Sequence, residues 1–174
     1  MKKQVSIRPW RLADAPDIAA VCNSRKIQDN LRDGLPFPYT TADAEFYIGS
    51  CLNAEPDTQF AFAITQGDKA IGSIGVFRKD NIHRLTGELG YYIGEAHWGN
   101  GYTAEAVRQI CRYVFENTDI VRIFAEPFAV NTASCRVLEK AGFVCEGTLR
   151  SNAIKNGRML DMHIWALLKG GEEK

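Results

Sequence analysis

The sequence predicts a mixed α/β (α+β) fold in which helices cover both faces of one sheet. Short apolar runs typical of strands recur along the chain, and segments with apolar residues at helical spacing separate them. No linker, repeat or change of composition divides the 174 residues, and this length can bury a core without metal or disulfide support. We therefore expect a single domain over residues 1–169, followed by a flexible tail at 170–174.

The N-terminal half predicts a strand, two helices and an antiparallel meander of three strands. Asp14 is a suitable cap for the first helix, and Thr41 or Asp43 starts the second. Between the two helices, NLRDGLPFPYT is rich in proline, glycine and aromatic residues, which predicts an irregular loop. A Gly67-Asp68 turn between two apolar runs predicts a hairpin. The strands are expected at 5–7, 60–65, 70–77 and 88–93.

The C-terminal half alternates strands and helices before it ends in two strands. Its clearest helix repeats apolar residues with the period of an amphipathic helix. These residues are Val107, Ile110, Cys111, Val114 and Phe115. Asn131 is a good N-cap for the next helix, which we expect to end at Gly142. The strands are expected at 121–125, 143–149 and 160–168.

The composition narrows the classes of function. Basic and acidic residues both number 21, so the formal net charge is zero, and we do not expect the basic surface of a nucleic-acid binder. Five cysteines without C-x-x-C spacing predict reduced thiols in a cytoplasmic protein, and three scattered histidines predict no metal site. The N-terminus is unlike a signal peptide, and there is no run of about 18 apolar residues, so we expect no membrane span.

Two glycines in WGNGYTAEAV precede the clearest helix and predict a phosphate site. Free N–H groups and about half a positive charge at a helix N-terminus attract phosphate. Gly99 to Ala104 also fits the dinucleotide spacing G-x-G-x-x-A, with Glu126 about 25 residues further on. The motif comes too late in the chain for that fold, however, and the G-K-[ST] of a nucleoside-triphosphate loop is absent. A plain glycine turn before a surface helix remains the alternative.

Further motifs surround this turn in a characteristic order. A strand ending in Tyr-Tyr-Ile precedes W-G-x-G-Y-x-x-E-A, and N-x-x-S-x-x-x-L-x-K-x-G-F follows the next strand. Together they closely resemble the GNAT acetyltransferase superfamily, best the branch that includes the N-terminal acetyltransferases of ribosomal proteins. LRDGLPFPYT-TADAEFYI resembles that branch's substrate-side loop and second helix, so the resemblance covers nearly the whole chain. It implies a mostly antiparallel sheet with a splayed central pair of strands.

The resemblance implies acetyl-CoA as the co-substrate. Its pyrophosphate would lie on backbone amides of the glycine turn, and its pantetheine arm would pair with the splayed strand as an added strand does. A backbone N–H near Ile93 would polarise the thioester carbonyl, and Asn131 would contact the arm. The cofactor-binding residues that it implies are Tyr91, Tyr92, Ile93, Trp98, Gly99, Asn100, Gly101, Tyr102, Thr103, Ala104 and Asn131.

The same resemblance implies two catalytic residues. Glu88, at the start of the splayed strand, is the candidate base, directly or through water; a solvated strand-end carboxylate is the alternative. Ser134 matches a serine that this branch uses to protonate the departing thiolate, although it could simply belong to a capped helix. Other branches place a tyrosine acid four residues later, where this chain has Leu138. A thiol of pKa about 8.5 leaves almost unaided near neutrality, so the loss need not matter.

The acceptor is expected to be a primary amine, either a protein N-terminal α-amine or a small-molecule amine. An α-amine of pKa about 7.8 is roughly one part in seven neutral at pH 7, whereas a lysine is nearer one in 2,500, which favours the α-amine. The pocket for it is expected from Trp10, Leu31, Phe37 and Tyr39, with Glu88. A non-catalytic acetyl-CoA-binding or sensor protein is the alternative function. Both a monomer and a homodimer fit the sequence.

Overall fold

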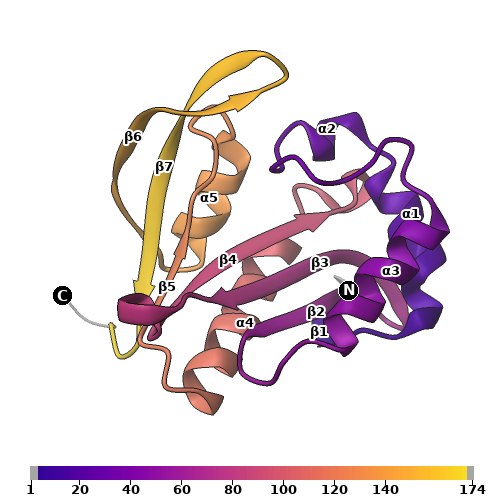
Figure 1. The fold of residues 1–174 in the computed structure, drawn as a ribbon, viewed down its shortest axis with the longest axis horizontal. Coiled ribbons are helices and arrows are strands. Elements are labelled where there is room, and N and C mark those ends of the chain that lie inside the picture. Colours follow the sequence, from indigo (N-terminus) through magenta and orange to yellow (C-terminus); the bar gives the residue numbers. More distant parts are fainter. Residues whose placement is uncertain (1–3, 172–174) are drawn as a thin grey trace.

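The computed structural model describes residues 4–171, which contain a seven-stranded sheet of order β1-β2-β3-β4-β5-β7-β6 (Figure 1). Each strand predicted from the sequence is present, usually with a residue or two more at its ends. The strands are β1 (Val5–Pro9), β2 (Gln59–Gln66), β3 (Lys69–Arg78), β4 (Thr86–Ile93), β5 (Arg122–Ala125), β6 (Val144–Lys155) and β7 (Arg158–Leu168). Residues 172–174 of the predicted tail lie outside the described residues, as do residues 1–3.

The sheet is mostly antiparallel, and its central pair of strands is splayed, as predicted. β2, β3 and β4 form the expected meander. β4 and β5 run parallel, but their pairing covers only Thr86 to Glu88 of β4. The remaining residues of β4 continue without β5 beside them, while β5 pairs with β7 on its other side. The backbone of β4 beyond Glu88 is therefore open on the side that faces β5.

Helices cover both faces of the sheet, which confirms the predicted fold class. α1 and α3 share a core with Ala63 and Ala70 on one face, whereas α4 and Leu138 of α5 pack into the larger core on the other. The helices are α1 (Ala15–Cys22), α2 (Arg25–Gln28), α3 (Thr41–Leu52), α4 (Tyr102–Asn117) and α5 (Thr132–Lys140). Among the described residues, no helix has the length and apolar character that crossing a membrane requires.

Two local predictions need correction. Asp14 does not cap α1 with its side chain: its carboxylate instead accepts hydrogen bonds from Arg8 and from the backbone of Arg11. β6 continues past the predicted end at 149 to Lys155, where Asn156 and Gly157, both with positive φ, turn the chain into β7. An Asn-Gly pair is the preferred two-residue hairpin turn, so the longer hairpin has a local cause in the sequence.

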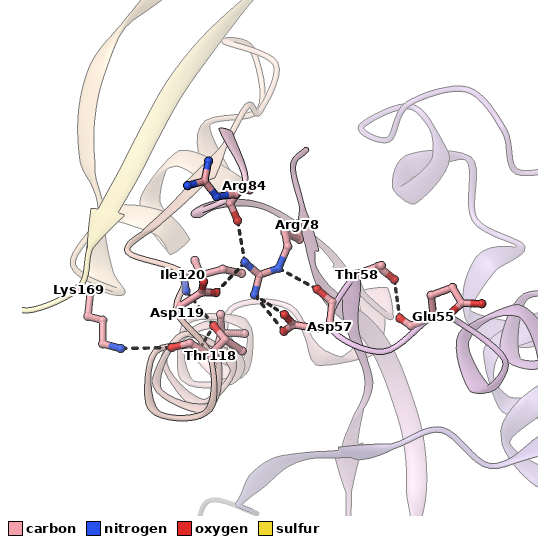
Figure 2. Close-up of polar contacts among 10 residues, drawn as sticks. Glu55, Asp57, Thr58, Arg78, Arg84, Thr118, Asp119, Ile120 and Lys169 are labelled. Carbon is pink, nitrogen blue, oxygen red and sulfur yellow. Dashed lines mark hydrogen bonds and ion pairs between the residues drawn. The ribbon is translucent and has the colours of Figure 1, made fainter. Parts of the chain in front are cut away.

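At the end of β3, Arg78 holds three loops together (Figure 2). Its Nη2 donates to both carboxylate oxygens of Asp57 at 2.9 Å, and its Nε donates to the Asp57 carbonyl at 2.8 Å. Nη1 donates to Asp119 at 2.8 Å and to the carbonyl of Arg84 at 2.7 Å. All five N–H donors of the guanidinium are thus used. These contacts fix the loops beside the short segment in which β4 still pairs with β5, because Arg78 pairs with Gly87 of β4.

Stability at low pH depends on the buried pair Arg8–Asp14. The hydrogen bond from Arg8 is the main cause that lowers the pKa of Asp14 below its ordinary 3.8. The pair stabilises the fold fully above the unfolded pKa, and this contribution is lost as the pH falls through the lower folded pKa. Asp14→Asn leaves Arg8 without a counter-charge and is expected to lower the free energy of unfolding by about 3–5 kcal/mol at pH 7. Urea unfolding of both proteins from pH 7 to pH 2 checks this, because their difference must shrink at the acid end.

Candidate active site

The glycine turn presents uncapped backbone N–H groups at the start of α4. Gly99 and Gly101 have φ of 75° and 78°, a left-handed conformation that favours glycine, and Gly101 is the N-cap of α4 without a side-chain cap. A Cβ on either glycine would meet nothing within 4 Å, so their outer side is open. Asn100 Nδ2 donates to the carbonyls of His97 and Trp98 at 3.2 and 3.1 Å, which fixes the turn. This arrangement suits an anion.

The open part of β4 leads from Glu88 to this turn. Trp98 Nε1 donates to the Ile93 carbonyl at 2.9 Å, so the last residue of β4 is tied to the start of the turn. Tyr91 and Tyr92 point to opposite faces of the sheet: Tyr91 packs against the core under α4, and Tyr92 against the core under α1 and α3. Burial raises the pKa of both hydroxyls, so both stay protonated at neutral pH.

Across the splay, the first turn of α5 faces Tyr91. Asn131 caps this helix, because its Oδ1 accepts the backbone N–H of Ser134 at 3.2 Å. The hydroxyl of Tyr91 lies 2.7 Å from Ser134 Oγ and 3.3 Å from the Ser134 carbonyl. The structure therefore joins two sequence-predicted site residues, one from each side of the splayed pair, by their hydroxyl groups.

Glu88 lies where β4 and β5 separate, and its side chain is only 18% exposed. It is not an isolated carboxylate: Arg32 Nη2 contacts its Oε1, and Lys79 Nζ lies 3.5 Å from its Oε2. The same Nη2 of Arg32 lies 3.3 Å from Oε2 of Glu126, which follows β5 directly. Two carboxylates and two cations thus meet at the end of the paired segment.

Two adjoining cavities lie beside this group, between the segment after α2 and the β6–β7 hairpin, which face each other in Figure 1. Their volumes are about 290 and 300 Å³. Leu31 and Phe37 line the first, and Arg25 stacks over the Phe37 ring at 3.7 Å from its centroid. Glu126 belongs to the second cavity. The cavity-lining residues that the two share are Arg32, Asp33 and Lys155.

The structure separates the four residues expected to bind the acceptor. Leu31 and Phe37 reach a cavity, but Trp10 and Tyr39 are each 4% exposed and belong to the core under α1 and α3. Trp10 packs edge-on against Tyr47 there. Sequence reasoning missed Arg32 as a partner of Glu88, and it considered Glu126 only as a ribose-binding acid. Arg32 lies inside NLRDGLPFPYT, a segment already assigned to the acceptor side.

Comparison with known proteins gives the family. Residues 4–144 match the family model described as the acetyltransferase (GNAT) domain. The chain therefore belongs to the GNAT acetyltransferase family, as its sequence motifs predicted. Its mostly antiparallel sheet also excludes the doubly wound dinucleotide-binding fold that the glycine spacing had left open.

Individual relatives agree with this assignment. The uncharacterized N-acetyltransferase p20 of Bacillus licheniformis is 33% identical over 111 residues, which span 64% of this chain and 62% of p20, less than two thirds of its length. The putative ribosomal N-acetyltransferase YdaF of Bacillus subtilis (strain 168) is 27% identical over 177 residues, 97% of this chain and 93% of YdaF. A structure of RimL, a ribosomal L7/L12 α-N-protein acetyltransferase, with coenzyme A has a TM-score of 0.84 at 16% identity; the match covers 98% and 97% of the two chains.

The left-handed backbone of the turn yields a prediction about stability. Gly101→Ala places a Cβ on a residue with φ of 78° and is expected to cost about 1–2 kcal/mol of unfolding free energy. Gly49→Ala in the interior of α3 is the matched control: nothing lies within 4 Å of its added Cβ, and it should stabilise by about 0.5–1 kcal/mol. Urea unfolding should show a lower free energy of unfolding for Gly101→Ala and a higher one for Gly49→Ala. Equal changes in the two variants would contradict the left-handed conformation of Gly101.

Proposed function

We propose that the chain transfers the acetyl group of acetyl-CoA to a primary amine by direct attack in a ternary complex. The observation that carries this proposal is one continuous path: uncapped amides at the start of α4, the open segment of β4, and Glu88 with Ser134 on either side of it. A binding or sensor protein needs the first two parts of this path. The two polar groups beside the open strand are what transfer of an acyl group additionally requires.

Acetyl-CoA fits the first part of the path. GNAT acetyltransferases use it, and the related RimL structure contains coenzyme A. Its pyrophosphate accepts hydrogen bonds from amides between Gly99 and Ala104, and its pantetheine arm pairs with the open backbone of Tyr91 to Ile93. The side-chain NH₂ of Asn131 faces the arm, because the Oδ1 of that amide is already occupied by the backbone of Ser134.

The chemistry needs two proton movements. The nitrogen lone pair of the amine attacks the thioester carbonyl carbon, and the carbonyl oxygen, polarised by a backbone N–H near Ile93, carries the developing negative charge. Glu88 accepts a proton from the amine, directly or through water. The C–S bond then breaks, the sulfur keeps the electron pair, and Ser134 Oγ donates a proton to it. Ser134 regains a proton from water, and Glu88 releases to water the proton that it took from the amine, so both residues return to their starting states. The products are the acetylated amine and CoA.

Tyr91 positions Ser134 in this scheme. Its hydroxyl lies 2.7 Å from Ser134 Oγ, and with the tyrosine as donor of this hydrogen bond the serine hydrogen is free to point at the sulfur. Because burial raises the pKa of Tyr91, its proton stays in place at neutral pH. A tyrosine from β4 thus supports the serine in a chain that has Leu138 where other branches carry the tyrosine acid.

The acceptor is a primary amine bound between the α2 segment and the β6–β7 hairpin. Leu31 and Phe37 supply apolar surface there, and Glu88 and Glu126 supply negative charge. YdaF is named as a putative ribosomal N-acetyltransferase, and this name favours a protein N-terminus over a small amine. We also assign the enzyme to the cytoplasm, since its five cysteines are free thiols.

Binding of the co-substrate is tested by thermal unfolding with saturating acetyl-CoA. At about 100 times Kd, binding adds about 2.7 kcal/mol to the free energy of unfolding, which corresponds to a Tm increase of about 5–10 °C for a domain of this size. NADH and ATP at the same concentration serve as controls, because both carry phosphates that a bare helix N-terminus could attract. An equal shift with all three would count against a specific acetyl-CoA site.

Turnover is tested with a Ser-initiated hexapeptide, spermidine and free lysine as acceptors. Glu88→Gln keeps the size of the side chain but cannot accept a proton, so kcat should fall at least about tenfold. The affinity for acetyl-CoA should stay unchanged. Glu116→Gln, on the exposed face of α4, is the matched control. An unchanged kcat in Glu88→Gln would remove this residue from the mechanism, and absence of turnover with every amine would favour the binding protein.

A further inference from the structure

Arg32 occupies an unusual position in the candidate acceptor site. One of its nitrogens, Nη2, contacts both Glu88 and Glu126, although the three residues come from the loop after α2, from β4 and from the end of β5. Without Arg32, Glu126 would face the second cavity with no cation beside it, and Glu88 would keep only Lys79, whose Nζ lies 3.5 Å from its Oε2. The position of Nη2 is therefore a cation site formed by two largely buried carboxylates, which are 18% and 22% exposed.

The residue that fills this cation site is itself held loosely. The Arg32 side chain is 62% exposed, and exposed ion pairs contribute little stability because water and salt compete with them. Its neighbour Asp33 is bound at 2.7 Å by Lys155 of the β6–β7 hairpin, so the backbone beside Arg32 is anchored. The side chain can therefore leave the carboxylates without a rearrangement of the loop.

The site matches the chemistry of the acceptor. Two carboxylates that share one nitrogen also suit a primary ammonium, whose three N–H groups can bond both and still leave one hydrogen free. Glu88 is already the proposed base, so an ammonium held at Nη2 has beside it the group that takes its first proton. Glu88 passes this proton to water before the amine attacks, and then accepts the second proton that the nitrogen loses. Arg32 also lines both cavities, so an acceptor bound in either one lies beside it.

We propose that Arg32 is a specificity-determining residue that fills the ammonium site of the acceptor and is displaced by it. This inference rests on the proposed acetyl transfer. Only an amine that carries its positive charge and gains further contacts in the two cavities can compete with the tethered guanidinium. Neutral or weakly held molecules leave Arg32 on Glu88 and Glu126. The enzyme thereby selects cationic primary amines, because the guanidinium of Arg32 competes with the acceptor for Glu88 and Glu126.

Isothermal titration in saturating CoA tests this without requiring turnover. The probes are the Ser-initiated hexapeptide and the same peptide with an acetylated N-terminus. Arg32→Ala is expected to bind the free-amine peptide about three- to tenfold more tightly than wild type, since two exposed ion pairs no longer compete. Binding of the acetylated peptide should not change. Arg112→Ala, on the exposed face of α4, loses the same charge and should match wild type.

A double-mutant cycle separates displacement from a general gain of negative potential. In the Glu126→Gln background, Arg32→Ala should tighten binding of the peptide by less than half as much, because one of the two shared carboxylates is neutral. An equal gain in both backgrounds would attribute the effect to long-range charge and overturn the proposal. Weaker or unchanged binding in Arg32→Ala would also overturn it, because Arg32 would then be a contact of the acceptor or a bystander.

The two proposals fail in different ways. If wild type and Arg32→Ala both bind CoA but neither binds the free-amine peptide, the ammonium site is refuted for a peptide terminus. Acetylation of spermidine in the turnover assay would leave the proposed function intact in that case. If no amine is acetylated by wild type, the proposed function fails irrespective of the titration.

Discussion

The early separation of β4 from β5 is the constraint on which the whole site depends. β5 ends at Ala125, and Pro127 two residues later has no N–H with which to continue a ladder. The chain then turns to β7 instead: the Pro127 carbonyl accepts from His163 at 3.0 Å, and Phe128 forms a bridge with Met162. Every β4 residue after Glu88 is left open on that side. β4 and β5 thus pair in parallel at the start of β4, and the backbone of β4 is unpaired on that side at its other end.

Both halves of the candidate site follow from this separation. The open backbone of β4 ends at the glycine turn, which Trp98 ties to Ile93, so the segments that we propose for the pantetheine arm and for the phosphates are continuous. Glu88 is the last residue of β4 that still pairs with β5, which puts a carboxylate where the open backbone begins. Next to it, Arg78 pairs with Gly87 of β4, and the Arg78 cluster fixes the loops at this end of the sheet (Figure 2). The loops next to the point where β4 and β5 separate are therefore held in place by hydrogen bonds and ion pairs.

Sequence alone could predict the parts of the site that have local causes. The α4 turn depends on glycines with positive φ, and α5 on an asparagine cap, and both signals stand within a few residues of the structure they produce. The contact of Arg32 with Glu88 and Glu126 spans 56 and 94 residues, and no local pattern encodes it. The aromatic residues of the first half are ambiguous for a different reason: Trp10 and Phe37 have similar chemistry, yet only packing decides that the first is buried and the second reaches a cavity.

The proposed acceptor side and the proposed cofactor side of the site are formed by different kinds of interaction. Backbone groups and glycines define the cofactor side, whereas ion pairs and polar side chains connect the α2 segment to the β6–β7 hairpin, with Lys155 on Asp33 at 2.7 Å and Asn156 on Asp29 at 2.9 Å. Backbone contacts are the same for any sequence that keeps the turn, but side-chain pairs change with single substitutions. In the proposed function, this division lets the cofactor side stay constant while the acceptor side varies. On the same proposal, specificity lies in residues such as Arg32, whose contacts can change while the splayed strands stay as they are.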